Sequence, residues 1–240
     1  GFGNAQVKGE GSGVSFDSAQ ETFTARYTHE TVALAFAITE EAIEDNLYDR
    51  LAARYTKALA RSMSNAKQVK AVEPLINGLP STNTFKSGDG VSLFNTSHTT
   101  VAGSFKNTLS TQADLNETSL EQSMIDIAKM TDERGLRIAA RGIKMIIPSE
   151  LQFTAERLMK SQGRTGTADN DINAIVSMGM VPQGYRINNY LTDSDAFYII
   201  TDVPNGMKMF TRAPLTTAME GDFDTGNVRY KARERYSFGV

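Results

Sequence analysis

Residues 21–65 read ETFTARYTHETVALAFAITEEAIEDNLYDRLAARYTKALARSMSN, and their hydrophobic period changes at Thr39. After Thr39 the apolar residues recur at helical spacing, which predicts a helix. An extended arm followed by one long helix is not typical of an enzyme core, but it suits a protein that lies across its neighbours. Before Thr39, apolar residues alternate as in a strand or an extended arm: Phe23, Ala25 and Tyr27, then Val32, Leu34, Phe36 and Ile38.

The long helix is expected to run from 39 to 67. Thr39 can cap it, and Glu40 and Glu41 follow in the first turn, where acids favour the helix dipole. At 1.5 Å per residue such a helix is roughly 40 Å long. Its apolar row drifts by about 40° at each step, so it winds around the helix and should touch several surfaces. That row is Ile43, Leu47, Leu51, Tyr55 and Leu59.

Charges divide along the same helix. The acids Glu41, Asp45 and Asp49 lie in its N-terminal half. Both charge sets can be explained as complementing the helix dipole on a solvated face, or as forming ion pairs with an adjacent subunit. The sequence alone slightly favours the first explanation and leaves the second open. The bases of the C-terminal half are Arg50, Arg54, Lys57 and Arg61.

Composition limits the function classes. The chain has 240 residues, enough for one large or two modest domains. Its net charge of −3 argues against a protein whose main role is to bind nucleic-acid phosphates. With no cysteine, disulfides, thiolate metal sites and cysteine nucleophiles are excluded. No apolar run approaches the roughly 20 residues that span a bilayer. Because the chain begins at Gly1 and stops at Val240 within an alternating strand, we expect a processed or partial chain.

The rest of the chain is a mixture of short strands and helices. Residues 1–13 are rich in glycine and are expected to be flexible or turn-like. Asn205-Gly206 is a strong signal for a hairpin turn. The other expected elements are, in chain order, a hairpin or extended arm over 14–38, loop over 78–118, a helix from a Ser119–Gln122 capping box, a strand at 143–147, a helix from a Ser149–Gln152 capping box, a loop at 161–171, a short helix at 171–178, strands at 185–190 and 196–201, and a final strand through 228–238.

Candidate catalytic and metal-binding groups are few. His29 and His98 are the only histidines, and His98 lies among hydroxyl residues in FNTSHTT. The G-x-S-x-G and H-E-x-x-H motifs are missing, and GRTGT at 163–167 fails the phosphate-loop pattern. The acids at 40–45 are explained by the helix dipole rather than by a cation site. We therefore expect no catalytic residue, no cofactor and no metal.

Three segments resemble tailed-phage major capsid proteins with the Hong Kong 97 type fold, of the Mu-like or a related group. The first, within 27–45, runs from Y-x-H-x-T into IT-x-E-A-I-x-D and is similar to the family's passage from extended loop to spine helix. The second, GIKMIIPSELQFTAERLMKS at 142–161, is similar to the unit that opens the axial domain. The third, 195–240, resembles the closing section of strand, hairpin and long return strand. Their order matches the family's, and together they span most of the chain.

The resemblance implies an α+β fold in four parts. Residues 1–38 would form an extended loop over a neighbour. Residues 39–136 would form a peripheral domain that includes the spine helix at 39–67. Residues 137–220 would form an axial domain, and 221–240 would be the strand that returns to the peripheral domain.

The implied function is structural. The chain would assemble with itself into hexamers and pentamers of an icosahedral head that encloses double-stranded DNA without sequence-specific binding. The family's usual partners would be a portal, a scaffold, a maturation protease and tail-completion proteins. The expected location is the virion capsid, assembled in the host cytoplasm, with no membrane partner. Two alternatives stay open: the shell of a cellular nanocompartment around protein cargo, and a small α/β enzyme, although the chain lacks a convergent catalytic set.

The last strand carries a basic face. Alternation places its four cations on one side, with Glu234 on the other. These cations could pair with acids of another subunit, such as Asp222 or Asp224, or contact packaged DNA, and we favour the pairing. The expected intersubunit contact residues are Phe23 and Tyr27 in the arm; Glu41, Asp45, Asp49, Arg50, Arg54 and Arg61 in the helix; and Arg229, Lys231, Arg233 and Arg235 in the last strand.

Overall fold

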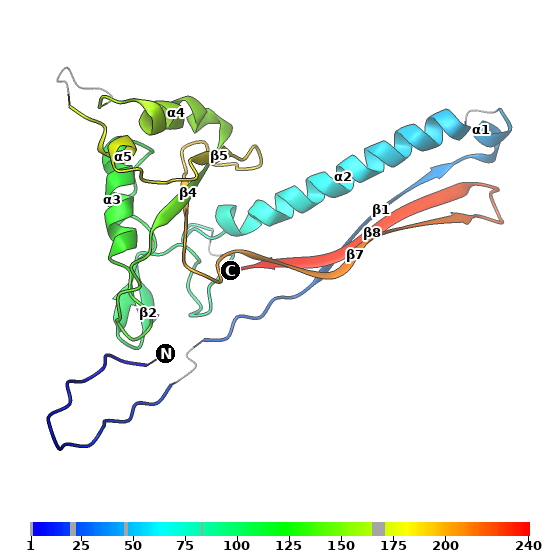
Figure 1. The fold of residues 1–240 in the computed structure, drawn as a ribbon. Helices are drawn as coiled ribbons and strands as arrows, with labels where there is room; N and C mark the ends of the chain where they lie inside the picture. Colours follow the sequence, from blue (N-terminus) through cyan, green and yellow to red (C-terminus); the bar gives the residue numbers. More distant parts are fainter. Residues whose placement is uncertain (1, 20–22, 46–47, 83, 165–170) are drawn as a thin grey trace. The chain divides into compact units, whose positions relative to one another are not determined.

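The chain forms two compact units, each made of two separate stretches of sequence. The first unit comprises Gly1–Ala25 and Leu75–Pro204, and the second comprises Arg26–Pro74 and Asn205–Val240. Figure 1 shows the elements of both units in the computed structural model. That structure describes these residues: 2–19, 23–45, 48–82, 84–164 and 171–240, the side chains at 48 and 49 excepted.

The second unit has two layers, a long helix and a three-stranded antiparallel sheet (Figure 1). The sheet has the order β1-β8-β7, so β8 is central and its neighbours are edge strands. β1 pairs with β8 along its whole length, from Glu30 opposite Tyr236 to Ile38 opposite Val228. The elements of this unit are β1 (Glu30–Ile38), α1 (Glu40–Glu44), α2 (Tyr48–Ile76), β7 (Lys208–Gly221) and β8 (Val228–Gly239).

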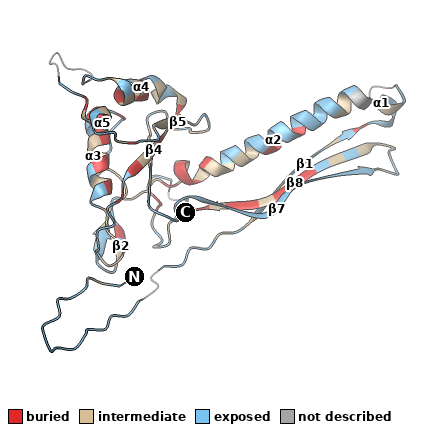
Figure 2. Cartoon of the chain, in the orientation of Figure 1, coloured by how far each residue is buried: buried red, intermediate tan, exposed pale blue. Residues whose placement is uncertain are grey.

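A small apolar core joins α2 to one face of this sheet. Leu59 and Met63 of α2 are buried against Ala232 of β8, and Val32 and Phe36 of β1 pack at the border. Residues two apart on a strand face the same side, which is why alternate residues of β8 reach the helix. Figure 2 shows that most of the α2 surface nevertheless stays exposed.

Aromatic and charged contacts extend this packing along the helix. Phe36 stacks on Tyr230, with ring centroids 5.0 Å apart, and meets Tyr55 edge to face at 5.6 Å. Glu234 is buried and pairs with Lys67 of α2 at 2.5 Å. The helix therefore occupies the side of β8 that carries Glu234, so the predicted position of this acid, opposite the four cations, is confirmed.

The helix that follows Thr39 is interrupted. Thr39 caps it as predicted, because its hydroxyl accepts the Ala42 N–H at 3.4 Å. The single helix expected over 39–67 is wrong, however, since α1 is capped at its C-terminus by Asp45, whose N–H bonds to the Glu41 carbonyl. Like charges four residues apart, such as Glu41 and Asp45, weaken a helix, which gives a physical reason for the interruption.

The second helix is longer than expected. α2 continues to Ile76, past the end predicted at residue 67. Val72 and Leu75 are buried, so the apolar face persists over these added turns. Most helical stability in proteins comes from such burial, which the local charge pattern does not reveal.

The first unit packs short helices against a three-stranded sheet of order β5-β4-β6. Its core includes Met145 and Ile147 of β4, Leu120 of α3 and Leu158 of α4, all buried. The central strand β4 pairs parallel with β5 and antiparallel with β6. The elements are β2 (His98–Thr100), β3 (Gly103–Phe105), α3 (Glu117–Ala128), β4 (Gly142–Ile147), η1 (Ser149–Leu151), α4 (Gln152–Lys160), α5 (Ala174–Ser177), β5 (Tyr185–Ile187) and β6 (Tyr198–Thr201).

Two predicted helix caps need correction. The cap of α3 is Asn116, whose side chain accepts the Ser119 N–H at 2.8 Å, while the Ser119 hydroxyl accepts the Asn116 N–H at 3.0 Å. Ser119 is therefore inside the helix rather than its cap. At Ser149 the chain enters the short turn η1, and neither η1 nor α4 has a side-chain cap bond. The S-x-x-Q spacing located both helices but misplaced their first hydrogen bonds, because Ser can occupy either end of a capping box.

The chain turns at Pro204 and Asn205, one residue before the predicted Asn205-Gly206 turn, and this turn does not join paired strands. Asn205 has a φ of 66°, but Gly206 has no positive φ, which a two-residue Asn-Gly hairpin turn would require. β6 precedes the turn and belongs to one sheet, whereas β7 follows it and belongs to the other. Because β7 pairs with β8, both strands belong to the second unit, and the unit borders lie at 25/26, 74/75 and 204/205. The division expected at 136/137 and 220/221 stays a prediction.

Candidate functional site

The sheet of the second unit turns one face to α2 and leaves the other open. The four cations of β8 lie on the open face, because they alternate with the residues that pack against the helix. All except Arg235 are exposed. The prediction that these charges share one side of the strand is confirmed. We call them the basic row: Arg229, Lys231, Arg233 and Arg235.

Small side chains flank Lys231 and Arg233 in both neighbouring strands, whereas Glu220 of β7 lies opposite Arg229. Residues directly opposite each other in a ladder point to the same face. The cations therefore rise above a shallow surface, at intervals of about 6.6–6.8 Å set by the strand repeat. The opposing residues are Thr31, Ala33, Ala35 and Ala37 in β1, and Ala213, Thr216, Ala218 and Glu220 in β7.

The cations at the centre of the basic row have no acidic partner in the described part of their own chain. Arg229 is different, since its guanidinium donates to Asp222 in the turn between β7 and β8. Asp222 is thus already paired, which corrects its expected availability to another subunit, whereas Asp224 stays exposed. No ion pair among the described residues involves Lys231 or Arg233.

α2 carries a second set of cations on the side away from the sheet. At 100° per residue they lie about half a turn from Leu59, which faces the sheet. All are exposed, and none has an ion pair within the ranges that the structure describes. The second unit therefore has cations on both of its outer surfaces. We call this set the helix row: Arg50, Arg54, Lys57 and Arg61.

The observed length of α2 changes how the helix row is explained. The dipole favours cations only in the last turn of a helix. Because α2 ends at Ile76, the helix row lies in its first half, where the dipole gives cations no advantage. The dipole explanation therefore fails for these bases, and their pairing with an adjacent subunit stays a prediction.

The acids predicted to complement these bases lie at the start of the helical segment. Glu41 and Asp45 are exposed at α1. Asp49 belongs to α2, but its side chain lies outside the described residues. The dipole does account for Glu41, which stands in the first turn of α1.

The two aromatic residues of the arm have contacts within their own chain. Tyr27 stacks on Phe210 with ring centroids 5.4 Å apart, and its hydroxyl donates to the Val240 carbonyl. Phe23 lies beside Gly88 and stays about half exposed, at 48%. Tyr27 therefore anchors the arm to its own sheet, and contact of either residue with another subunit stays a prediction.

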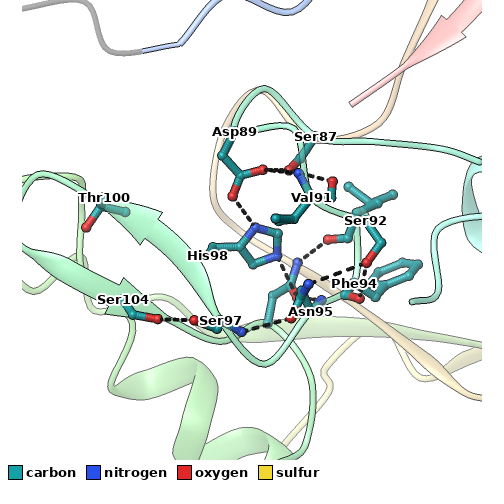
Figure 3. Close-up of polar contacts among 12 residues, drawn as sticks. Ser87, Asp89, Val91, Ser92, Phe94, Asn95, Ser97, His98, Thr100 and Ser104 are labelled. Atoms are coloured by element: carbon teal, nitrogen blue, oxygen red, sulfur yellow. Dashed lines mark hydrogen bonds and ion pairs between the residues drawn. The ribbon is translucent and has the colours of Figure 1, made fainter. Parts of the chain in front are cut away.

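His98 is a buried structural group. Its Nδ1 lies 2.7 Å from an Asp89 carboxylate oxygen, and its Nε2 lies 3.2 Å from the Asn107 side-chain oxygen. Figure 3 shows the ring facing Asp89. Ser87 donates to Asp89 rather than to the ring. Burial raises the pKa of Asp89, but hydrogen bonds from Ser87, His98 and the Val91 N–H outweigh it and leave that pKa lowered. The network ties the loop before β2 to that strand.

Other candidate chemistry finds little support in the described residues. His29 lies 3.1 Å from the Ser237 hydroxyl. Of GRTGT at 163–167, residues 165–167 lie outside the described part, and Arg164 pairs with Glu117 at 3.2 Å. No group of three or more potential ligand side chains in the described chain could hold a metal ion. None of the described helices combines the length and apolar character that crossing a membrane requires.

The sequence matches a family model described as phage capsid protein over residues 21–240. A comparison with the curated proteins found no match. The resemblance to tailed-phage capsid proteins that the sequence predicted is confirmed by this model, although it does not distinguish the Mu-like group.

Solved capsid structures are similar to the chain over nearly its whole length. The capsid of an empty GTA particle has a TM-score of 0.54 at 14% identity, covering 98% of this chain and 76% of that one. Gordonia phage Cozz has a TM-score of 0.51 at 13% identity, covering 99% and 74%. The capsid of Myoviridae phage XM1 has a TM-score of 0.50 at 12% identity, covering 99% and 78%. At such low identity these likenesses concern the fold, and they establish an α+β capsid fold.

Proposed function

The chain belongs to the phage capsid protein family and is a structural subunit of an icosahedral viral head, not an enzyme, and we propose that it builds this head as hexamers and pentamers of itself around double-stranded DNA. The virion capsid is accordingly its location. The nanocompartment shell is the less supported alternative, because the matching family model is one of phage capsids. The enclosed DNA is held without sequence-specific contacts, which agrees with a net charge of −3.

We propose the Hong Kong 97 type arrangement for the two units. The second unit, with α2 as the spine helix and β8 as the return strand, is the peripheral domain. The first unit from residue 75 onward is the axial domain. The arm that precedes β1 forms the extended loop, which lies over a neighbouring subunit. β1 itself pairs within its own sheet, so the loop is shorter than the expected 1–38. Assignment to the Mu-like or a related group stays a prediction.

One observation carries the hexamer and pentamer proposal: the second unit has exposed cations on both outer surfaces that form no ion pair with the described residues, and exposed acids at α1. A closed ring forms when each copy offers one surface to the next copy and receives another surface from the previous one. Arg54 and Lys231 represent the two rows of bases, and Asp45 and Asp224 represent the exposed acids available to them. Ion pairs between copies would neutralise groups that have no ion pair within the described part of one copy.

Other partners follow from the family resemblance. A portal would occupy one vertex of the head, a scaffold would guide assembly in the host cytoplasm, and a maturation protease and tail-completion proteins would act afterwards. No membrane partner is expected.

Electron microscopy of the full-length protein, expressed alone and with a scaffold, tests the assembly. We expect closed shells, tubes or capsomer rings. A monomer under both conditions would refute the shell proposal.

Charge reversal of the basic row tests the ion pairing. Lys231→Glu with Arg233→Glu should lower particle yield by at least about tenfold, because like charges brought together across an interface cost several kcal/mol. Lys129→Glu with Arg186→Glu is a matched control, since both residues are exposed cations of the first unit. If particles form normally but retain less DNA, the basic row contacts DNA instead of a neighbour.

A further inference from the structure

The outer edge of β7 is the most open part of the second unit, and we propose that it accepts a segment of a second copy as a fourth strand. The accepting stretch is Thr216–Gly221, and the added segment is Gly13–Asp17. This inference rests on the proposed function, because it names the surface on which the extended loop lies. It predicts backbone pairing between copies, with Phe16 of one copy beside Met219 of the next.

β7 has the features of an unprotected edge strand. It is 14 residues long, and every residue except Ala213 is exposed. On its outer side, alternate N–H and C=O groups point away from β8 and find no ladder partner in the described chain. A long exposed edge of this kind is a template for pairing with another chain.

Features that prevent an edge strand from pairing with another chain occur in only one half of β7. The pairing with β8 is irregular between Thr211 and Thr216, a stretch that contains Arg212 and Pro214. Bulges, charges and proline are the usual devices that keep an edge from pairing. From Thr216 to Gly221 the ladder is regular, so this half can receive a partner.

The opposite edge strand, β1, is less available. Ile38 of β1 is buried, and Val32 and Phe36 pack against α2. β7 contributes no side chain to the buried core of the unit. The two edges therefore differ, and β7 is the one that a further strand would complete.

An apolar side chain on β7 indicates where the added strand would pack. Met219 lies opposite Tyr230, on the face that α2 covers farther along the sheet, yet 63% of Met219 is exposed. A neighbouring strand would place its own side chains directly beside Met219. Apolar residues at alternate positions of that strand would bury this surface.

Residues 13–17 of the arm have the required pattern. Val14 and Phe16 alternate with Ser15 and Asp17, and they are 69% and 99% exposed. The segment is not part of any described strand. Apolar side chains would thus meet Met219, and polar ones would lie on the side of the basic row. The preceding residues of the arm, rich in glycine, are poor strand formers.

The arm is held at the end of this segment. Asp17 accepts the Gly3 N–H at 2.7 Å and pairs with Arg134 at 2.8 Å. These bonds close the intervening loop, whose turn is made by the Ser12 N–H bonding to Gly9 at 3.2 Å. Fixing both ends reduces the conformational entropy lost when the loop pairs with another chain.

Introduced cysteines test the pairing directly, because the chain has none of its own. Phe16→Cys and Met219→Cys are made as separate single variants, mixed, assembled and oxidised. We expect a covalent dimer of about twice the 26.2 kDa chain on a non-reducing gel. Each variant, when assembled and oxidised alone, should give at most about 10% of the dimer that the mixture gives. Both positions are exposed, so these changes should leave the folded chain intact.

The matched control uses the other edge of the sheet. Phe16→Cys mixed with Leu34→Cys, which is similarly exposed on β1, should not cross-link. Equal cross-linking of both mixtures would refute the choice of β7. The double variant, with Phe16→Cys and Met219→Cys in one chain, is oxidised as well. If a disulfide forms only within that double variant, the strand beside β7 comes from the same chain and not from a second copy.

Failure of the inference is distinguishable from failure of the proposed function. If shells form and the Phe16→Cys and Met219→Cys mixture does not cross-link, the strand pairing is wrong and the shell function stands. If the parent protein forms no shells, tubes or rings, the proposed function is refuted, and the strand pairing that rests on it is refuted too. A second variant, Phe16→Asp, should reduce particle yield without changing the melting temperature of the unassembled chain, and normal yield would also contradict the pairing.

Discussion

The first unit builds a sizeable buried core, whereas the second unit buries little and leaves most of its surface exposed. Nine residues of the first unit, Leu120 and Met145 among them, form one buried cluster, while the cluster in the second unit has three: Leu59, Met63 and Ala232. The second unit has only two thin layers, so side chains on the outer side of each layer have nothing of their own unit to cover them. We therefore predict that its stability and its assembly depend on different residues.

Charge separates the two units in the same way. The first unit contains 12 bases and 17 acids, and the second contains 13 bases and 11 acids. The overall charge of −3 hides this difference. A weakly basic second unit and an acidic first unit suit pairing between copies, because each copy offers both signs.

The largest expected effect is on the core of the first unit. Leu120→Ala should lower the free energy of unfolding by about 2–5 kcal/mol, because it leaves a cavity where a side chain is fully buried. Denaturant unfolding of the unassembled chain measures it. Ile125→Ala, exposed on the same helix, is the control and should cost less than about 0.5 kcal/mol. Equal losses would contradict the self-contained core.

A smaller loss is expected where α2 meets the sheet. Lys67→Met leaves the buried Glu234 carboxylate without its cation and should cost about 1–3 kcal/mol. Lys70→Met is the matched control, because Lys70 pairs at the same 2.5 Å with Glu30, which is exposed. It should cost about 0–1 kcal/mol. Thermal unfolding of both variants measures the difference, and equal losses would show that burial of Glu234 does not matter.

The helix row should separate stability from assembly. Arg54→Ala with Lys57→Ala should change the free energy of unfolding by less than about 0.5 kcal/mol, because both side chains are exposed and unpaired in the described chain. Assembly should nevertheless weaken, and assembly of the parent protein should weaken with added salt. Light scattering during assembly measures this. Unchanged assembly would remove the helix row from the interface.

The smallest expected effect concerns the arm. Hydrogen bonds from the Gly3 N–H and Arg134 lower the pKa of Asp17. A lowered pKa means that these bonds persist above the ordinary pKa and are lost as the pH falls through the lowered value. Arg134→Ala should raise the pKa of Asp17 toward its ordinary value, as an NMR titration of the carboxyl would show. An unchanged pKa would mean that Arg134 does not hold the arm in solution.

Local sequence patterns were sufficient for several elements. Thr39 was recognised as a cap because its hydroxyl and the acids after it act within one turn. The four cations of β8 were assigned to one face because alternation follows from strand geometry alone. The capsid family was recognised from the order of three segments. Each of these features depends on residues close together in the chain.

Long-range pairing was not visible in those patterns. The turn at Asn205 has hairpin chemistry, but only the folded chain shows that β7 pairs with β8 rather than with β6. Likewise, nothing local indicates that Asp222 is taken by Arg229, or that α2 extends to Ile76. Those outcomes depend on which surfaces are buried together. Periodicity and capping are short-range consequences of backbone geometry, whereas strand order, helix length and the pairing of charges follow from tertiary packing between distant residues.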